Sequence, residues 1–130
     1  MMKTKKILAA LLAAAMLLLC FAGCGKKDAT DLDYVKEKGT LLVGITEFEP
    51  MDYKAADGSW IGFDADMAKA FAESLGVKAE FVIIDWDNKI MELNNKSIDC
   101  VWNGMTLTDE VKSSMECSTP YCNNAQVVVL

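Results

Sequence analysis

From residue 39 onward, apolar runs of strand length alternate with stretches of helical pattern, and this alternation constrains the fold more than any other feature. The run 40–45, "TLLVGI", is apolar throughout, as expected of a buried strand. Residues 64–76 follow as an amphipathic helix and residues 77–85 as a second strand. Strands that alternate with helices predict an α/β fold with a mainly parallel sheet and helices on both faces.

The remaining elements are weaker but fit the same scheme. Turn residues and periodicity predict a short helix over 33–38 closed by Gly39, a β-hairpin over 53–63 around Asp57-Gly58, a short helix over 86–97, a strand over 98–104, a helix over 108–115 and a last strand over 125–130. Asp109 and Glu110 would lie in the first turn of the helix over 108–115, where acids suit the helix dipole.

The helix over 64–76 has the clearest pattern in the chain. We expect Asp64 to be its N-cap and Gly76 to follow its last turn. Its apolar side chains fall on one face: Met67, Ala68, Phe71, Ala72 and Leu75. Asp64 and Asp66 resemble a catalytic carboxylate pair, but capping and solvent exposure account for them.

The N-terminus has the order of a secretory signal, which we place at residues 1–23. Three lysines precede an uncharged run over 7–23 that ends in small residues. The alternative is a retained membrane anchor, because a run of about 17 apolar residues is at the lower limit for spanning a bilayer. The stretch "FAGC" resembles a lipoprotein lipobox, which implies acylation of Cys24, a flexible tether over 24–38 and an exported protein that lipid anchors to the outer face of the membrane.

The charge of the exported part excludes several classes of partner and site. Without the three signal lysines, ten lysines remain against 19 acidic residues, a net charge near −9. An acidic chain without a basic stripe argues against nucleic acid as a partner. The chain contains no histidine and no arginine, which weakens zinc-enzyme and serine-hydrolase readings, although carboxylate catalysis stays open.

Three cysteines remain besides Cys20 and Cys24, namely Cys100, Cys117 and Cys122. An exported chain permits a disulfide, and Cys117 with Cys122 is the nearer pair in sequence. The alternative is that all three are small buried hydrophobic residues. We expect no metal site and no cofactor.

Ligands of open α/β sheets bind outside the carboxyl ends of the strands. Three turns lie there, over 46–53, 85–88 and 103–109. Phe48 and Trp86 offer flat apolar faces, although both are also candidates for core aromatics. The turn "NGMTLTD" carries Asn103, Gly104 and Thr106 ahead of a helix start, where N–H groups and hydroxyls suit an anionic group. These residues are our candidate substrate-binding set.

Five segments occur in the order and spacing of a known family: "GTLLVGITEFEPMDY", "GFDADMAKAFAESLGV", "DWDNKIMEL", "SIDCVWNGMTLTDE" and "STPYCNNAQVVVL". They resemble the extracellular solute-binding proteins, family 3, that deliver amino acids to ABC importers. The resemblance implies one lobe of a type 2 periplasmic-binding-protein fold, in which Phe48 and Trp86 stack on the ligand while Gly104 and Thr106 hold its carboxylate. It also implies that Thr108 starts a helix, where its simpler role is an N-cap.

Two departures from the family qualify this expectation. The family usually has an arginine where this chain has Val111, and Lys112 next to it lacks the planar fork of a guanidinium. The family also has a second lobe, so residues 39–130 correspond to a first lobe that is truncated before the second.

The function expected on this resemblance is a substrate-binding receptor, not an enzyme, with an amino acid or similar polar solute and an ABC permease as partners. The alternatives are a sensor ectodomain and an enzyme on the same fold, such as a dehydratase or a wall-lytic lipoprotein module.

Overall fold

The structure is a computed structural model that describes residues 30–125 and 127–129. The predicted signal over 1–23 and the lipidation site Cys24 lie outside these residues. Residues 31–130 form one compact unit. Within the described ranges, no helix combines the length and apolar character that crossing a membrane requires.

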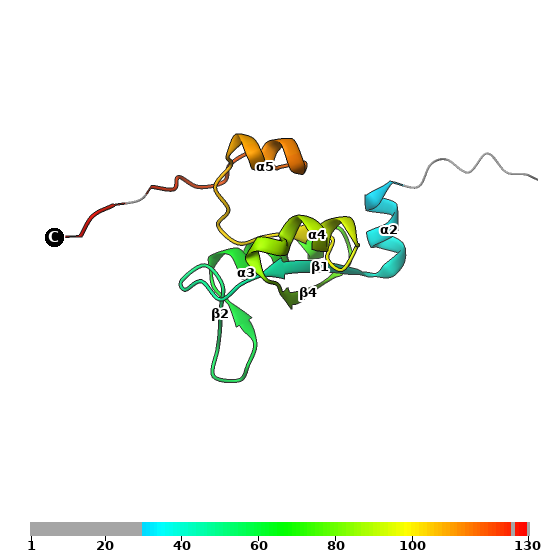
Figure 1. Cartoon of the computed structure of the whole chain (residues 1–130). Helices are drawn as coiled ribbons and strands as arrows, with labels where there is room; N and C mark the ends of the chain where they lie inside the picture. Colours follow the sequence, from blue (N-terminus) through cyan, green and yellow to red (C-terminus); the bar gives the residue numbers. More distant parts are fainter. Residues whose placement is uncertain (1–29, 126, 130) are drawn as a thin grey trace, which may run out of the picture. The chain divides into compact units, whose positions relative to one another are not determined.

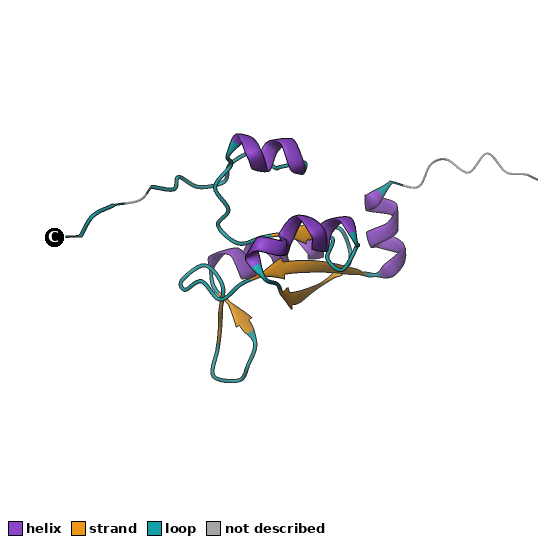
Figure 2. Cartoon of the chain, in the orientation of Figure 1, coloured by secondary structure: helices purple, strands orange, loops and turns teal. Residues whose placement is uncertain are grey.

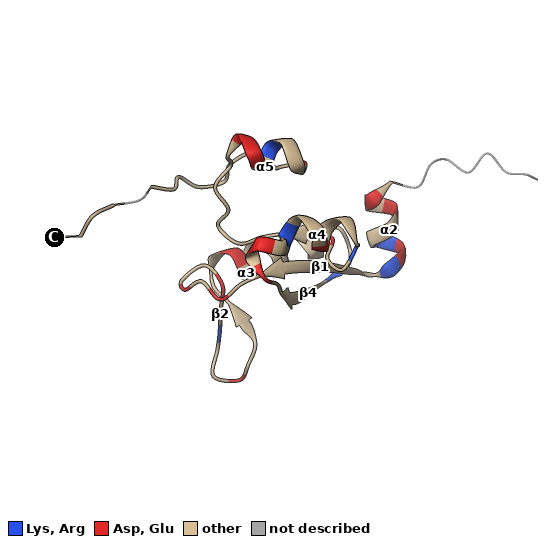
Figure 3. Cartoon of the chain, in the orientation of Figure 1, with Lys and Arg blue, Asp and Glu red and all other residues tan. Residues whose placement is uncertain are grey.

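The first described element is the helix α2, Asp31–Lys38. The acids Asp31 and Asp33 lie in its first turn and the lysines Lys36 and Lys38 in its last turn, so both ends complement the helix dipole (Figure 3). Val35 is buried in the core. The short helix predicted over 33–38 is confirmed and begins two residues earlier, because a buried apolar side chain and favourable end charges stabilise it. Residues 31–38 of the tether predicted over 24–38 are therefore helical.

A three-stranded parallel sheet forms the centre of the fold (Figures 1 and 2). Its strands are β1 (Thr40–Ile45), β4 (Lys78–Ile83) and β5 (Cys100–Val101), in the order β4-β1-β5. Val43 of β1 faces Phe81 of β4 on one side and Cys100 of β5 on the other. The parallel sheet is confirmed, but β5 is shorter than the strand predicted over 98–104.

The helix α3 (Phe63–Ser74) packs against the sheet, and the hairpin of β2 (Tyr53–Lys54) and β3 (Trp60–Ile61) packs against α3. The core joins side chains from the helices α2 and α3, from β1, from the hairpin and from the residue before β4: Val35, Leu41, Val43, Ile45, Trp60, Ala65, Ala68, Ala72 and Val77. Small alanines on the inner face let α3 approach the sheet closely. The predicted apolar face is confirmed only in part, because Phe71 is 46% exposed.

The start of α3 differs from the prediction. Gly62, not Asp64, is the N-cap, and no side chain caps the helix. The backbone carbonyls of Pro50 and Met51 accept hydrogen bonds from the first N–H groups of the helix instead, including one of 3.0 Å from Asp64 to Met51. Since the loop already supplies these acceptors, the Asp64 side chain is free to turn inward, and it is fully buried.

The later elements follow the predicted order. The 3-10 turn η1 (Trp86–Asn88) leads into α4 (Lys89–Asn94), and α5 spans Asp109–Ser114. Thr108 is the N-cap of α5, as predicted, and its hydroxyl accepts from the Val111 N–H at 3.2 Å. Residues 125 and 127–129 do not form the predicted strand, because a strand needs a ladder partner and none lies beside them in the described chain.

Candidate functional site

The turn after β1 and the turn after β5 lie next to each other. Phe48 follows β1 and is 54% exposed. A Cβ atom placed on Gly104 would lie 3.5 Å from Cε1 of the Phe48 ring. The aromatic residue and the glycine, far apart in sequence, are therefore in van der Waals reach of each other, as expected of neighbouring loops at one sheet edge.

Asn103 joins the same two turns through its amide. The amide orientation follows from its neighbours, because only one orientation gives both of its atoms suitable partners. In that orientation Nδ2 donates to Oδ2 of Asp52 at 2.8 Å, and the amide oxygen accepts from the hydroxyl and the N–H of Thr46. Asn103 is buried, so its amide supports the site from within.

Asp64 of α3 makes hydrogen bonds to the turn and to Tyr121. Its Oδ2 accepts from the Gly104 N–H at 2.8 Å, and its Oδ1 accepts from the Tyr121 hydroxyl at 2.8 Å. The Gly104 N–H, which the sequence offered as a ligand donor, is thus engaged by the protein itself. We predicted that capping and solvent exposure account for the two acids of α3. This is wrong for Asp64, which is buried, whereas the Asp66 side chain is 69% exposed.

Asp52 is a second buried carboxyl group next to Asp64. Burial, and then the charge of Asp64, raise the pKa of Asp52 from 3.8 to about 7. Its Oδ2 accepts from Asn103, whereas its Oδ1 is buried without a partner among the described residues. A neutral carboxylic acid at this position avoids placing two negative charges side by side in a buried region.

Thr106 is the exposed member of the turn. Its hydroxyl oxygen accepts from Nδ2 of Asn124 at 3.0 Å, which leaves the hydroxyl hydrogen available to a ligand. Val111, where the family usually has arginine, is buried with 9% exposure. That position therefore contributes to packing and offers no cation.

Trp86 lies in η1, where Asp85 caps the turn by accepting from the Asp87 N–H at 3.1 Å. The ammonium of Lys89 lies 4.7 Å from the centre of the Trp86 ring and donates to the Trp86 carbonyl at 3.0 Å. The ring is half-buried and does not belong to the core cluster.

A hollow of about 670 Å³ lies beside the turn. Asn103, Gly104 and Thr106 line it, whereas Phe48 and Trp86 do not. Trp102 also lines it and packs on Phe71, with ring centres 5.7 Å apart. Trp102 is partly buried and packs against the core as well as forming a wall of the hollow.

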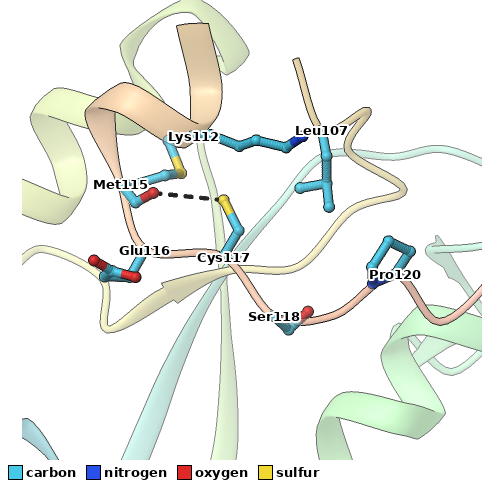
Figure 4. A pocket seen from close by; sticks show the side chains of 7 residues that line it. All are labelled: Leu107, Lys112, Met115, Glu116, Cys117, Ser118 and Pro120. Carbon is cyan, nitrogen blue, oxygen red and sulfur yellow. Dashed lines mark hydrogen bonds between the residues drawn. The ribbon is translucent and has the colours of Figure 1, made fainter. Parts of the chain in front are cut away.

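A smaller hollow of about 340 Å³ lies between α5 and the segment that follows it (Figure 4). The Cys117 thiol points at the Met115 carbonyl there, at 3.5 Å. Cys100, Cys117 and Cys122 are all free, so the structure shows no disulfide between Cys117 and Cys122. The alternative of three buried cysteines also fails, because Cys122 is exposed and the other two are only partly buried.

Sequence reasoning missed three residues of this site, Asp52, Asp64 and Tyr121. Asp64 was assigned to a cap, and the other two had no pattern that marked them. A glycine two residues before Asp64 at the helix start was the available clue, because backbone carbonyls can replace a side-chain cap where a glycine lets them come close.

The sequence profile of the bacterial extracellular solute-binding proteins, family 3, matches residues 41–130. The chain belongs to this family. The L-cystine-binding protein TcyJ of Escherichia coli strain K12 is 38% identical over 114 residues, which are 85% of this chain and 43% of TcyJ. Cyclohexadienyl dehydratase of Pseudomonas aeruginosa is 30% identical over 118 residues, which are 90% of this chain and 44% of the relative.

The arginine-bound form of domain 1 from TmArgBP, an ArgBP of T. maritima, is similar in structure. It is 40% identical, has a TM-score of 0.65 and shares 68% of this chain and 71% of its own. The predicted type 2 periplasmic-binding-protein fold is thereby confirmed for the matched part of this chain. The chain spans about half the length of the curated relatives it matches.

Proposed function

We propose that this family 3 chain is the ligand-binding part of a receptor that captures an amino acid and delivers it to an ABC permease. The proximity of the exposed Phe48 ring to Gly104 carries the proposal, because it brings an apolar contact surface and the hydroxyl-bearing turn into one place. Such a combination suits a small solute with one apolar and one anionic part.

In this proposal the ligand carboxylate binds without an arginine. The Val111 side chain is buried and its N–H donates to Thr108, so neither is available to a ligand. The Gly104 N–H donates to Asp64. We assign the Thr106 hydroxyl as the side-chain donor of the turn, and Phe48 and Trp86 as the aromatic contacts that the family resemblance implies.

The chain can be tested for binding directly, because domain 1 of TmArgBP, to which it is similar, was crystallised in an arginine-bound form. We expect the chain to bind L-arginine or L-cystine in titration calorimetry. The Thr106→Val variant, which removes the hydroxyl and keeps the shape, is expected to lose about 1–3 kcal/mol of binding free energy.

Thr40→Val is the matched control, because Thr40 lies at the opposite end of β1 from the site. Equal affinities of the wild type and Thr106→Val would contradict the carboxylate turn. A wild type that binds neither amino acid would contradict the proposed function of this chain.

An enzyme on the same fold is the second candidate, and the similarity to cyclohexadienyl dehydratase favours it. In such an enzyme, the buried carboxyl groups of Asp52 and Asp64 would act as the general acid and the general base. Mass spectrometry of a solute incubated with the chain separates the two candidates, because a receptor returns the solute unchanged and an enzyme does not.

We also propose that the mature protein is exported and anchored by lipid on Cys24. The basis is the lipobox-like stretch before Cys24 and the family's extracellular character. The intact mass of the protein extracted from membranes with detergent tests this. Cys24→Ser is expected to abolish the mass of the acyl chains, and a mass that still includes residues 1–23 would contradict the proposal.

A further inference from the structure

We propose that Asp64 is the positioning residue of the ligand-binding turn. Its buried carboxylate accepts a hydrogen bond from the Gly104 N–H, which fixes that peptide, and a second one from the Tyr121 hydroxyl. This inference rests on the proposed function. Asp64 does not touch the ligand in this scheme, and it acts through the backbone that carries Thr106.

Capping of α3 does not explain why Asp64 is buried. It is the second residue of α3 and has no exposed surface. The usual reason for an acid there is to accept from the free N–H groups of the first turn. The carbonyls of Pro50 and Met51 already accept from those groups, so the carboxylate is not needed for capping.

The contacts of Asp64 point away from its own helix. Each oxygen has one donor, the Gly104 N–H and the Tyr121 hydroxyl, both at 2.8 Å. These donors are 40 and 57 residues away in the sequence. A carboxylate in a buried region binds such donors more strongly than an amide would, because a charged acceptor strengthens the hydrogen bond.

Asp64 and the exposed aromatic residue both lie close to Gly104. A Cβ atom on Gly104 would lie 3.8 Å from Oδ2 of Asp64 and 3.5 Å from the Phe48 ring. The hydrogen bond to Asp64 fixes the Gly104 peptide, and Thr106 follows two residues later. Asn103, the residue before Gly104, is held independently through Asp52 and Thr46.

The Tyr121 contact extends the same support to the segment after α5. The Tyr121 ring packs on Phe63 and Trp102, with ring centres 6.2 and 6.3 Å apart. Asn124 of this segment donates to the Thr106 hydroxyl at 3.0 Å. One buried carboxylate therefore fixes both the turn that carries Thr106 and the segment whose side chain contacts it.

The test compares Asp64→Asn with Asp66→Asn in the full chain. Both changes remove a negative charge from α3, but the Asp66 side chain is 69% exposed and pairs only with Lys69 among the described contacts. We expect Asp64→Asn to weaken the binding of L-arginine or L-cystine by about tenfold, because a neutral amide accepts more weakly than a carboxylate and so fixes the Gly104 peptide less firmly. Asp66→Asn is expected to bind as the wild type does.

Amide hydrogen exchange of the ligand-free protein distinguishes positioning from loss of stability. In Asp64→Asn we expect faster exchange at residues 103–106 and unchanged exchange in β1. If exchange became faster in both regions, with the same free energy of opening at residues 103–106 as in β1, the variant would have lost stability in general, and the inference would be overturned. Unchanged exchange at Gly104 would overturn it as well.

The proposed function and this inference fail in different ways. A wild type that binds neither amino acid rejects the proposed function, and the exchange pattern of residues 103–106 then still decides whether Asp64 positions the turn. A wild type that binds, with an Asp64→Asn variant of equal affinity, rejects the inference alone. Tyr121→Phe removes only the second donor, and we expect it to keep the Gly104 exchange rate of the wild type.

Discussion

At the scale of single residues, the buried carboxyl groups determine how the site responds to pH. Asp52 has no exposed surface, and burial with the charge of Asp64 raises its pKa to about 7. The folded protein therefore binds this proton more tightly than the unfolded chain does. The associated stability is fully present below about pH 4, near the ordinary pKa of 3.8, and it is lost as the pH rises through 7.

We expect Asp52→Asn to flatten this dependence. In the wild type, the contribution of Asp52 to the free energy of unfolding should fall by on the order of 3 kcal/mol between about pH 4 and about pH 8. Urea unfolding across that range measures it, with Glu47→Gln as a control in the same loop, where Glu47 is exposed. Parallel profiles of the wild type and Asp52→Asn would show that Asp52 does not carry the proton.

At the scale of elements, the junction between β3 and α3 depends on Gly62. Its φ is +118°, and a Cβ atom there would collide with the Met51 carbonyl and lie 2.7 Å from the Pro50 oxygen. These two carbonyls are the ones that accept from the start of α3. Because these carbonyls lie so close to the start of α3, residue 62 has no room for a side chain.

We expect Gly62→Ala to lower the free energy of unfolding by about 3 kcal/mol or more, because the collision involves backbone atoms that cannot move away. Gly39→Ala is the matched control, because Gly39 has a φ of +76° and nothing within 4 Å of its Cβ position. It should show only the cost of the left-handed backbone, about 1–2 kcal/mol. Equal losses in both variants, measured by urea unfolding, would show that the contact with the loop 50–51 does not matter.

At the scale of the whole molecule, one ion pair joins α2 to the residue before the edge strand β5. The Lys38 ammonium donates to both oxygens of Asp99, at 2.6 and 2.9 Å, and Oδ2 of Asp99 also accepts from the Leu42 N–H. The Asp99 side chain is only 7% exposed. The pair therefore holds α2, β1 and the entry to β5 together.

We expect Lys38→Met to destabilise the fold by about 1–3 kcal/mol, because it leaves a buried carboxylate without its cation. Lys36→Met is the control, since Lys36 is an exposed lysine in the same last turn of α2. Thermal unfolding of the two variants measures the difference. A Lys38→Met variant as stable as Lys36→Met would mean that the pair is dispensable.

Local patterns in the sequence predicted most of the elements. The apolar run 40–45 coincides with β1, the pattern over 64–76 with α3, and the hydroxyl before two acids with the Thr108 cap of α5. These features depend on neighbours within a few residues, so the sequence alone contains the necessary information. The failures at β5 and at residues 125 and 127–129 concern strands, because a strand forms only where a distant segment pairs with it.

The candidate site could be predicted only in outline. The sequence placed Phe48 and the turn 103–106 at strand ends, which brings them to one edge of any parallel sheet. It assigned Asp64 to a cap and Asp52 to no role, because the partners of both acids lie 40 or more residues away and no periodicity reveals them.

By itself, the sequence determined the order of strands and helices, the family and the exposed turns, since these follow from periodicity, turn residues and the spacing of motifs. Only the tertiary structure decided that the carbonyls of Pro50 and Met51 cap α3 and that Asp64 turns inward to hold Gly104 and Tyr121. The physical reason is that a buried hydrogen bond depends on which groups meet when the chain folds, and a side chain with two possible partners takes the one that the surrounding backbone leaves free.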